Sequence, residues 1–106
     1  MINKPHTQKK LCLAESMIDT SSASYYIQRL CKHFQHKVTA SWDTQQGCIK
    51  FAMGECHLTA ESHSLKMQCT SEDSEGLSEI IDTMQSHFLR FNRDNLTALS
   101  WQTCNE

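Results

Sequence analysis

Hydrophobic residues are spaced in two different ways along this chain, and the change between the two spacings restricts the fold. From Ala23 to Phe34, and again from Leu77 to Phe91, apolar residues recur every three or four positions, which is the spacing of an amphipathic helix. From Val38 to Cys69 they recur every second position, as expected of strands with one buried face. The sequence therefore predicts two helices that flank a group of strands.

The region of period two divides into four expected strands, separated by the turn-like segments DTQQG, Gly54 and ESHS. Their apolar residues are Val38, Ala40 and Trp42, then Ile49, Phe51 and Met53, then Cys56, Leu58 and Ala60, and finally Leu65, Met67 and Cys69. Two more strands are expected, one in KKLCLAESM at residues 9–17 and a short one at residues 96–101. Each of the four central strands has one apolar and one polar face, which is typical of an antiparallel sheet covered on one side.

The expected fold class is α+β, in the order β-α-β-β-β-β-α-β, with both helices on one face of the sheet. This order is similar to the plan of the TATA-binding-protein-like folds, an architectural analogy that carries no function. Ser21 and Ser22 are expected to cap the first helix, and the acidic segment TSEDSEG to begin the second. Residues 1–8 are expected to be a flexible tail, and residues 9–104 a single domain.

Composition excludes several classes of function. A formal net charge of −2 with scattered Lys and Arg argues against a nucleic-acid partner, which requires a clustered positive field. Neither a secretory signal nor an apolar run of about 20 residues is present, so we expect no membrane partner and a cytoplasmic protein. The six cysteines should then be reduced. The sequence has no C-x-x-C motif, the pattern that would indicate a zinc ribbon or a redox pair.

The segment LCKHFQHK, residues 30–37, concentrates thiol and imidazole groups on the first helix. Helical rotation turns Cys31 toward the sheet and His36 away from it, and it places Cys31 and His33 on different sides of the helix. These two residues therefore cannot share a metal unless the helix unwinds. His33 and His36 are three apart and can hold a transition metal if a third ligand arrives from elsewhere. The alternative is that His36 is solvated and His33 flanks the core.

His87 lies at the edge of the second apolar stripe, as His33 lies at the edge of the first. Two helices side by side on a sheet would bring these edges together, so we expect a titratable pair with Arg90 one turn on as an anion anchor. The alternative is that each imidazole forms a hydrogen bond to a backbone or carboxylate group at the rim of the core.

Cys56 and Cys69 share the parity of their strands' apolar residues and are expected to act as small core hydrophobes. Cys56 also follows the turn at Gly54, where a thiol can be reachable, so it is retained as a candidate ligand. Glu15, Glu55 and Glu61 show no pairing that predicts an acid/base dyad.

Four segments carry a family resemblance: YYIQRLCKHFQHK, GECHLTAE, HFLRFNRD and the terminal LSW. In that order and at these separations, residues 9–102 resemble the bacterial domain-of-unknown-function family 2218. Phe34 stands where many relatives have tryptophan, and FNRDN replaces a more acidic continuation. The positions that match the family's pattern are Leu30, Cys31, His33, His36, Lys37, Gly54, Cys56, His87, Arg90 and Phe91.

The resemblance implies a link to iron handling, since domains of this family are found attached to or near siderophore-interacting ferric reductases. The first functional hypothesis is therefore a non-catalytic accessory protein that binds iron, zinc, haem or an iron chelate. Its ligands would come from His33, His87, Arg90 and Cys56, or, for a metal, from His33, His36, His87 and Cys31.

Two further hypotheses compete with this one. The second is a protein-interaction module, either a homodimer or a partner of a ferric reductase, that docks through an exposed strand edge such as the short first or last strand. The third is a small enzyme in which a nearby histidine activates Cys56 or Cys31.

Overall fold

The computed structural model describes residues 11–105, and side chains through residue 103. The tail predicted at residues 1–8 lies outside the described residues. The order of elements confirms the predicted fold class. The elements are β1 (Cys12–Asp19), α1 (Ala23–Phe34), β2 (Thr39–Trp42), β3 (Gln46–Phe51), β4 (Gly54–Ala60), β5 (Ser64–Ser71), α2 (Ser74–Arg90) and β6 (Gln102–Asn105).

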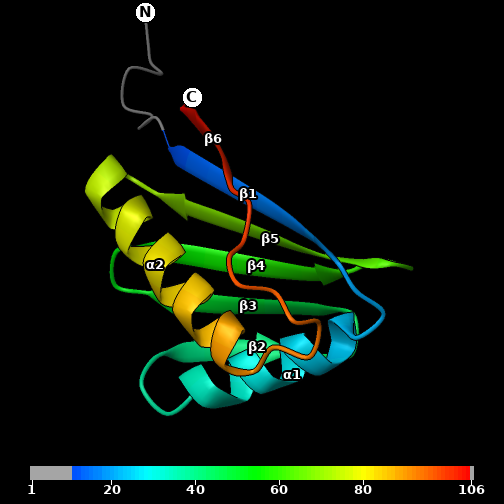
Figure 1. Cartoon of the computed structure of the whole chain (residues 1–106). Helices are drawn as coiled ribbons and strands as arrows, with labels where there is room; N and C mark the ends of the chain where they lie inside the picture. Colours follow the sequence, from blue (N-terminus) through cyan, green and yellow to red (C-terminus); the bar gives the residue numbers. More distant parts are fainter. Residues whose placement is uncertain (1–10, 106) are drawn as a thin grey trace, which may run out of the picture.

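The strands form one antiparallel sheet in the order β2-β3-β4-β5-β1-β6. Both helices lie on the same face of this sheet, and the segment that joins α2 to β6 crosses that face beside them (Figure 1). We call the helix-covered face the inner face and the opposite one the outer face. Neither helix covers the outer face, and polar strand residues such as His57, Lys66 and Gln68 lie there, whereas Ser16 and Ser71 are buried.

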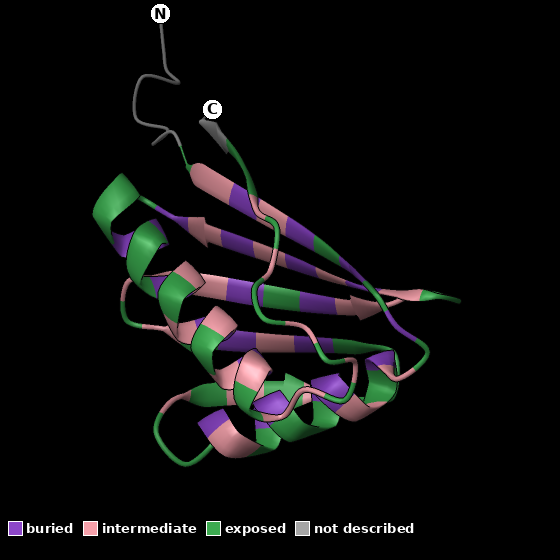
Figure 2. Ribbon diagram, in the orientation of Figure 1, coloured by how far each residue is buried: buried purple, intermediate pink, exposed green. Residues whose placement is uncertain are grey.

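The core lies between the inner face and the helices (Figure 2). The apolar stripe of α1 is buried as predicted, and so are Cys56 and Cys69 on the strands. Helix α1 packs closely against β3 at Gly47, where a Cβ would lie 2.9 Å from Cys31 Sγ and 3.1 Å from Ile27 Cγ2. A larger residue at position 47 would therefore force the helix away from the sheet.

The two helices begin differently. Asp73 caps α2 as the acidic segment predicted, since its carboxylate accepts a hydrogen bond from Gly76 N at 2.6 Å. The prediction of a serine hydroxyl cap on α1 is wrong, because Ser22 makes no side-chain cap hydrogen bond. Instead Ser22 N donates to Thr20 Oγ1 at 2.9 Å, so the residue before the serine pair fixes the entry of the chain.

The last strand is displaced from its predicted position. Residues 96–101 are irregular, and β6 begins only at Gln102. The apolar residues that suggested a strand pack against the core instead, and Gln85 Oε1 accepts from both Leu99 N at 3.2 Å and Trp101 Nε1 at 3.3 Å. Residues 92–101 therefore act as a strap that lies beside the helices rather than as part of the sheet.

Asp94 fastens the start of the strap to α1. Its carboxylate accepts hydrogen bonds from Tyr26 Oη at 2.5 Å and from Thr20 Oγ1 at 2.9 Å. Arg93 N donates in turn to Tyr26 Oη at 2.7 Å. Burial, followed by the hydrogen bond to Asp94, raises the pKa of Tyr26 to about 12, so the phenol stays protonated at physiological pH.

Within residues 11–105, no helix has the length and apolar character needed to cross a membrane.

Candidate functional site

Three ligand-bearing side chains converge on the outer face of β3 and β4. Cys48 and His57 are direct cross-strand partners in the antiparallel register, and Glu55 lies two residues before His57 on the same face. Parity explains the placement, because Ile49 and Cys56 enter the core and their neighbours must face outward. We call Cys48, Glu55 and His57 the outer-face cluster.

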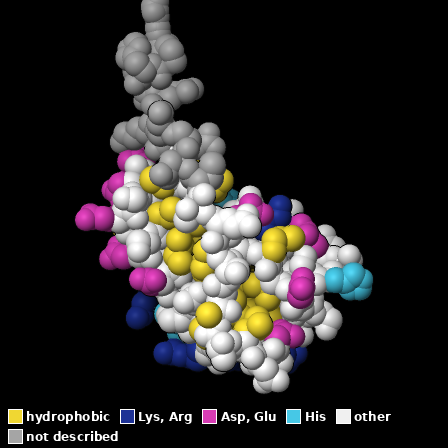
Figure 3. Space-filling view, turned by 45° about the horizontal axis from the view of Figure 1, so that its top comes forward, with side chains coloured by type: hydrophobic (Ala, Val, Ile, Leu, Met, Phe, Trp, Pro, Cys, Tyr) yellow, Lys and Arg dark blue, Asp and Glu magenta, His cyan; other side chains and the backbone are white. Residues whose placement is uncertain are grey.

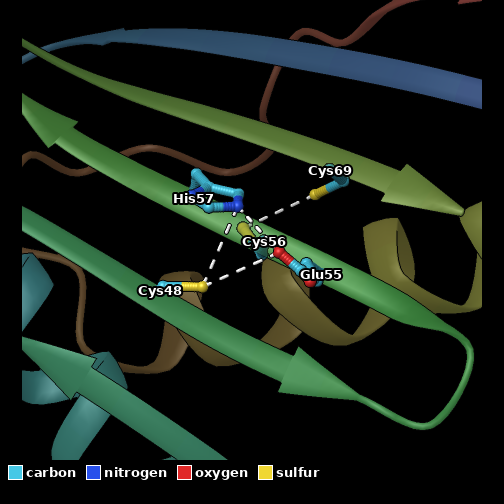
Figure 4. Close-up of polar contacts among 5 residues, drawn as sticks. All are labelled: Cys48, Glu55, Cys56, His57 and Cys69. Atoms are coloured by element: carbon cyan, nitrogen blue, oxygen red, sulfur yellow. Dashed lines mark hydrogen bonds and ion pairs between the residues drawn. The ribbon is translucent and has the colours of Figure 1, made fainter.

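The ligand atoms of the outer-face cluster lie within 4.8 Å of one another. His57 Nε2 donates to Glu55 Oε1 at 2.9 Å, while Cys48 Sγ lies 3.8 Å from His57 Nε2 and 3.9 Å from Glu55 Oε1 (Figure 4). Within residues 11–103, the outer-face cluster is the set of at least three His, Cys, Asp or Glu side chains whose ligand atoms all lie this close together.

These separations are close to those of a tetrahedral metal site. With Zn–S of about 2.3 Å and Zn–N and Zn–O of about 2.0 Å, sulfur lies about 3.5 Å from the other two ligands, which lie about 3.3 Å apart. The cluster matches these values after side-chain movements of about 0.4 Å. A metal would replace the proton shared by His57 and Glu55, and water or another molecule would take the fourth position.

The outer-face cluster is accessible and has room beside it. The side chains of His57 and Glu55 are 50% and 41% exposed, while Cys48 is half-buried. A hollow of about 420 Å³ touches Cys48 and His57, and one of about 680 Å³ touches Glu55. Both solvent and a small ligand can therefore reach an ion bound there.

The thiol of Cys48 is protonated in the metal-free protein. Burial is the largest factor that raises its pKa, followed by the charge of Glu55, while Lys50 lowers it. Thiolate formation at this position therefore needs a cation that replaces the proton, which is how metals bind cysteine.

The predicted histidine pair does form where α1 and α2 meet. The rings of His33 and His87 lie 4.7 Å apart between centroids, and His33 also contacts Phe34 and Phe91 at 5.2 and 5.7 Å. His87 Nδ1 donates to the backbone oxygen of Thr83 at 2.8 Å, in line with the alternative reading of a hydrogen bond to backbone. The Nε2 atom of His87 is then the nitrogen with a free lone pair.

The other predicted ligands are either exposed near the helix ends or buried in the core. His36 is exposed beyond the end of α1, and Arg90 is exposed at the end of α2. Both act on His33 through charge, and burial together with the charges of His87, Arg90, Lys37 and His36 lowers the pKa of His33. A shared metal at His33, His36, His87 and Cys31 stays a prediction.

Two of the predicted thiols are inaccessible. Cys31 is completely buried against β3, and this burial raises its pKa to about 11. Cys56 is also completely buried, and its hydrogen-bonding contact with Cys69 at 3.5 Å together with burial raises its pKa well above the usual value. Neither thiol is the reachable, ionised nucleophile that the enzyme hypothesis requires.

Sequence reasoning missed the outer-face cluster because it followed the apolar parity of each strand. A two-residue turn at Ala52 and Met53 pairs Phe51 with Gly54, and counting outward from this pair places Cys48 opposite His57. Placing the turn at Gly54 hides that register. A search of polar residues for ligands paired across each expected hairpin would have found the site.

Residues 15–102 match the family described as uncharacterized proteins conserved in bacteria, DUF2218. The chain belongs to this family. An NMR structure of PA4090 from Pseudomonas aeruginosa is similar to it, with a TM-score of 0.69 and 26% sequence identity over 90% of this chain and 96% of that one. No curated protein matches the chain.

Proposed function

We propose that this DUF2218 protein is a non-catalytic metal-binding protein that holds one divalent transition-metal ion at the outer-face cluster. The convergence of Cys48 Sγ, Glu55 Oε1 and His57 Nε2 within 4.8 Å carries the proposal. Adjacent paired strands position all three side chains, so little chain ordering is needed on binding. Three protein ligands leave an open coordination position, the arrangement of sites that exchange or present a metal.

The donor set favours zinc among the abundant ions. A thiolate and an imidazole suit zinc better than magnesium or calcium, and zinc lies above ferrous iron in the order of divalent affinities. The resemblance to domains found near ferric reductases supports ferrous iron as the second ion to test. Three ligands that point at one small volume fit a bare ion better than haem, whose iron is already held by four porphyrin nitrogens.

Cobalt titration tests the proposal, because a cobalt–thiolate bond produces a near-ultraviolet charge-transfer band. We expect one equivalent of Co²⁺ to produce this band in the wild-type protein, and Zn²⁺ to abolish it by displacement. His57→Ala should lower the cobalt affinity by about 100-fold, a loss at least as large as that from removing an outer-shell partner. His63→Ala is the matched control, since His63 is exposed in the turn between β4 and β5 and its removal should change nothing.

A role in iron handling requires that the bound ion be ferrous iron rather than zinc. Protein purified without a histidine tag under anaerobic conditions should contain ferrous iron at the outer-face cluster if this role holds. Zinc in its place would retain the metal site and reject the iron role. Absence of the cobalt band in the wild-type protein, or a band undiminished in His57→Ala, would reject the metal site itself.

A protein-interaction module is the second candidate function, and the ends of the sheet favour it. Strands β2 and β6 are the two edges of the sheet, so the last strand is an edge as expected, whereas the first strand, β1, lies between β5 and β6. An edge strand presents backbone groups that can pair with another chain. The partner would be a second copy or a ferric reductase. Light scattering after size exclusion should then report a dimer, whereas a strict monomer with no reductase retained in a pull-down would reject this candidate.

A further inference from the structure

Positive charge is concentrated on one part of the helix-covered side. Five of the ten Lys and Arg residues lie on α1, on the last turn of α2 or just beyond these helices, together with three histidines. There is no acidic residue from Thr20 to Trp42 or from Thr83 to Arg93. The cationic residues are Arg29, Lys32, Lys37, Arg90 and Arg93, and the three histidines among them are His33, His36 and His87.

Acidic residues gather elsewhere, over the first half of α2. Figure 3 shows acidic side chains along the upper left edge of the molecule and Lys and Arg side chains below them. Five of the twelve acidic residues fall within residues 72–82. Asp94, which follows the cationic region, uses its carboxylate on Tyr26 and Thr20. The cationic region is therefore a distinct surface.

Two cation–ring contacts and one histidine pair form a row between α1 and the residues at and just beyond the end of α2. Arg93 Cζ lies 3.5 Å from the ring centroid of Tyr25, and Arg29 Cζ lies 4.5 Å from that of Phe91. The third contact is the pair of His33 and His87, 4.7 Å apart. We call these six residues the basic seam.

The basic seam has a regular spacing. Tyr25, Arg29 and His33 are four residues apart on α1, so consecutive contacts lie about 6 Å apart along the helix axis. Aromatic rings rather than carboxylates hold both guanidinium groups, and the Arg and Lys residues of this surface make no ion pair within residues 11–103. The arginines are thus ordered before any anion arrives, which lowers the entropy cost of binding.

We propose that the basic seam is a docking surface for an acidic segment of a partner protein. Carboxylates four residues apart on a helix, or two apart on an extended strand, are separated by about 6 to 7 Å and match the row. Each arginine can take a carboxylate with two parallel hydrogen bonds. The cations around His33 supply the excess positive field that such a segment would neutralise.

A protein segment fits this surface better than a nucleic acid does. From Tyr25 to Phe34 the surface extends about 14 Å along the axis of α1, too short to follow a long phosphate backbone. The acidic residues of the first half of α2 and the net charge of −2 repel a long polyanion beyond this length. A short acidic segment is confined to the cationic region.

Fluorescence anisotropy with a labelled peptide tests the proposal on the full chain. The probe is a helical peptide with glutamate at every fourth position, and the same peptide with glutamine there is its control. We expect the glutamate peptide to bind and the glutamine peptide not to bind, with an affinity that falls as salt is added. Equal binding of the two peptides, or no binding of either, would overturn the proposal.

Matched double variants locate the binding. Arg29→Gln with Arg93→Gln removes both guanidinium groups of the basic seam and should weaken the glutamate peptide at least tenfold. Lys50→Gln with Lys66→Gln removes the same charge from the outer face and should change the affinity less than twofold. Equal losses in the two variants would overturn the proposed location.

Two further measurements keep this result decisive. Lys32→Gln with Lys37→Gln changes exposed residues of the same surface and should also weaken the peptide, so a folding defect in the arginine variant would not end the test. Competition with single-stranded polyuridylate should be weaker than competition with unlabelled glutamate peptide. Tighter binding of the RNA would overturn the proposal in favour of a nucleic-acid surface.

Discussion

Cys48 and Cys56 are the same residue type on paired strands, yet they belong to two different environments. Cys48 faces outward beside His57 and Glu55, while Cys56 faces inward against Cys69. Cys56 is fully buried and Cys48 is half-buried. The thickness of one sheet thus separates a thiol that can meet an ion from a thiol that fills space.

The difference shows that the parity of a residue on its strand, rather than its chemistry, decides its role. The inner thiol contributes apolar volume to a closely packed core. The outer thiol contributes a ligand atom, because the paired strand provides an imidazole directly opposite and a carboxylate two residues away. Three predictions sharpen this comparison.

Thiol labelling should show the largest difference between the two cysteines. A maleimide can reach Cys48 in the folded protein, whereas Cys56 becomes reachable only when the sheet opens. We expect native-state labelling of Cys56 to be slower by about 1,000-fold or more, since opening the core costs a large part of the stability of a small domain. Peptide mapping by mass spectrometry measures both rates, and similar rates would contradict the inner and outer assignment.

Metal affinity should depend on pH through the outer thiol. The pKa of Cys48 is raised, so below that pKa the metal must displace one proton. Affinity should then fall about tenfold for each pH unit lost, or about 100-fold from pH 8 to pH 6. Competition of Zn²⁺ with a chromophoric chelator measures this dependence. A pH-independent affinity in the wild-type protein would exclude the thiol as a ligand.

Stability should respond to serine substitution on the inner side alone. Cys56→Ser places a hydroxyl in the core and should lower the free energy of unfolding by about 1 to 3 kcal/mol. Cys48→Ser lies at the surface and should change it by less than about 0.5 kcal/mol. Urea denaturation followed by circular dichroism gives both values. A larger loss at position 48 than at position 56 would reverse the comparison.

Much of the fold was predictable because periodicity reports burial directly. The stripe of α1 and the alternation of β4 and β5 gave the correct inner faces, and Cys56 and Cys69 were correctly placed in the core. The contact between His33 and His87 also followed from the apolar stripes of the two helices, because each histidine lies at the edge of its stripe.

The features that could not be predicted from the sequence depend on long-range contacts. The strap at residues 92–101 mimics a strand, but Gln85 and Tyr26 fix it from distant positions in the chain. The outer-face cluster depends on hairpin register, which a shift of one residue would destroy. Polar residues on an exposed face leave no periodic signal of their own, so Cys48, Glu55 and His57 were not nominated together.

Zinc stoichiometry is the measurement that tests the central claim most directly. Native mass spectrometry after dialysis against Zn²⁺ should find one bound ion in the wild-type protein and in Cys12→Ser, whose half-buried thiol lies on β1. The ion should be lost from Cys48→Ser. A wild-type protein that retains no zinc, or a Cys48→Ser variant that retains as much as the wild type, would contradict the account.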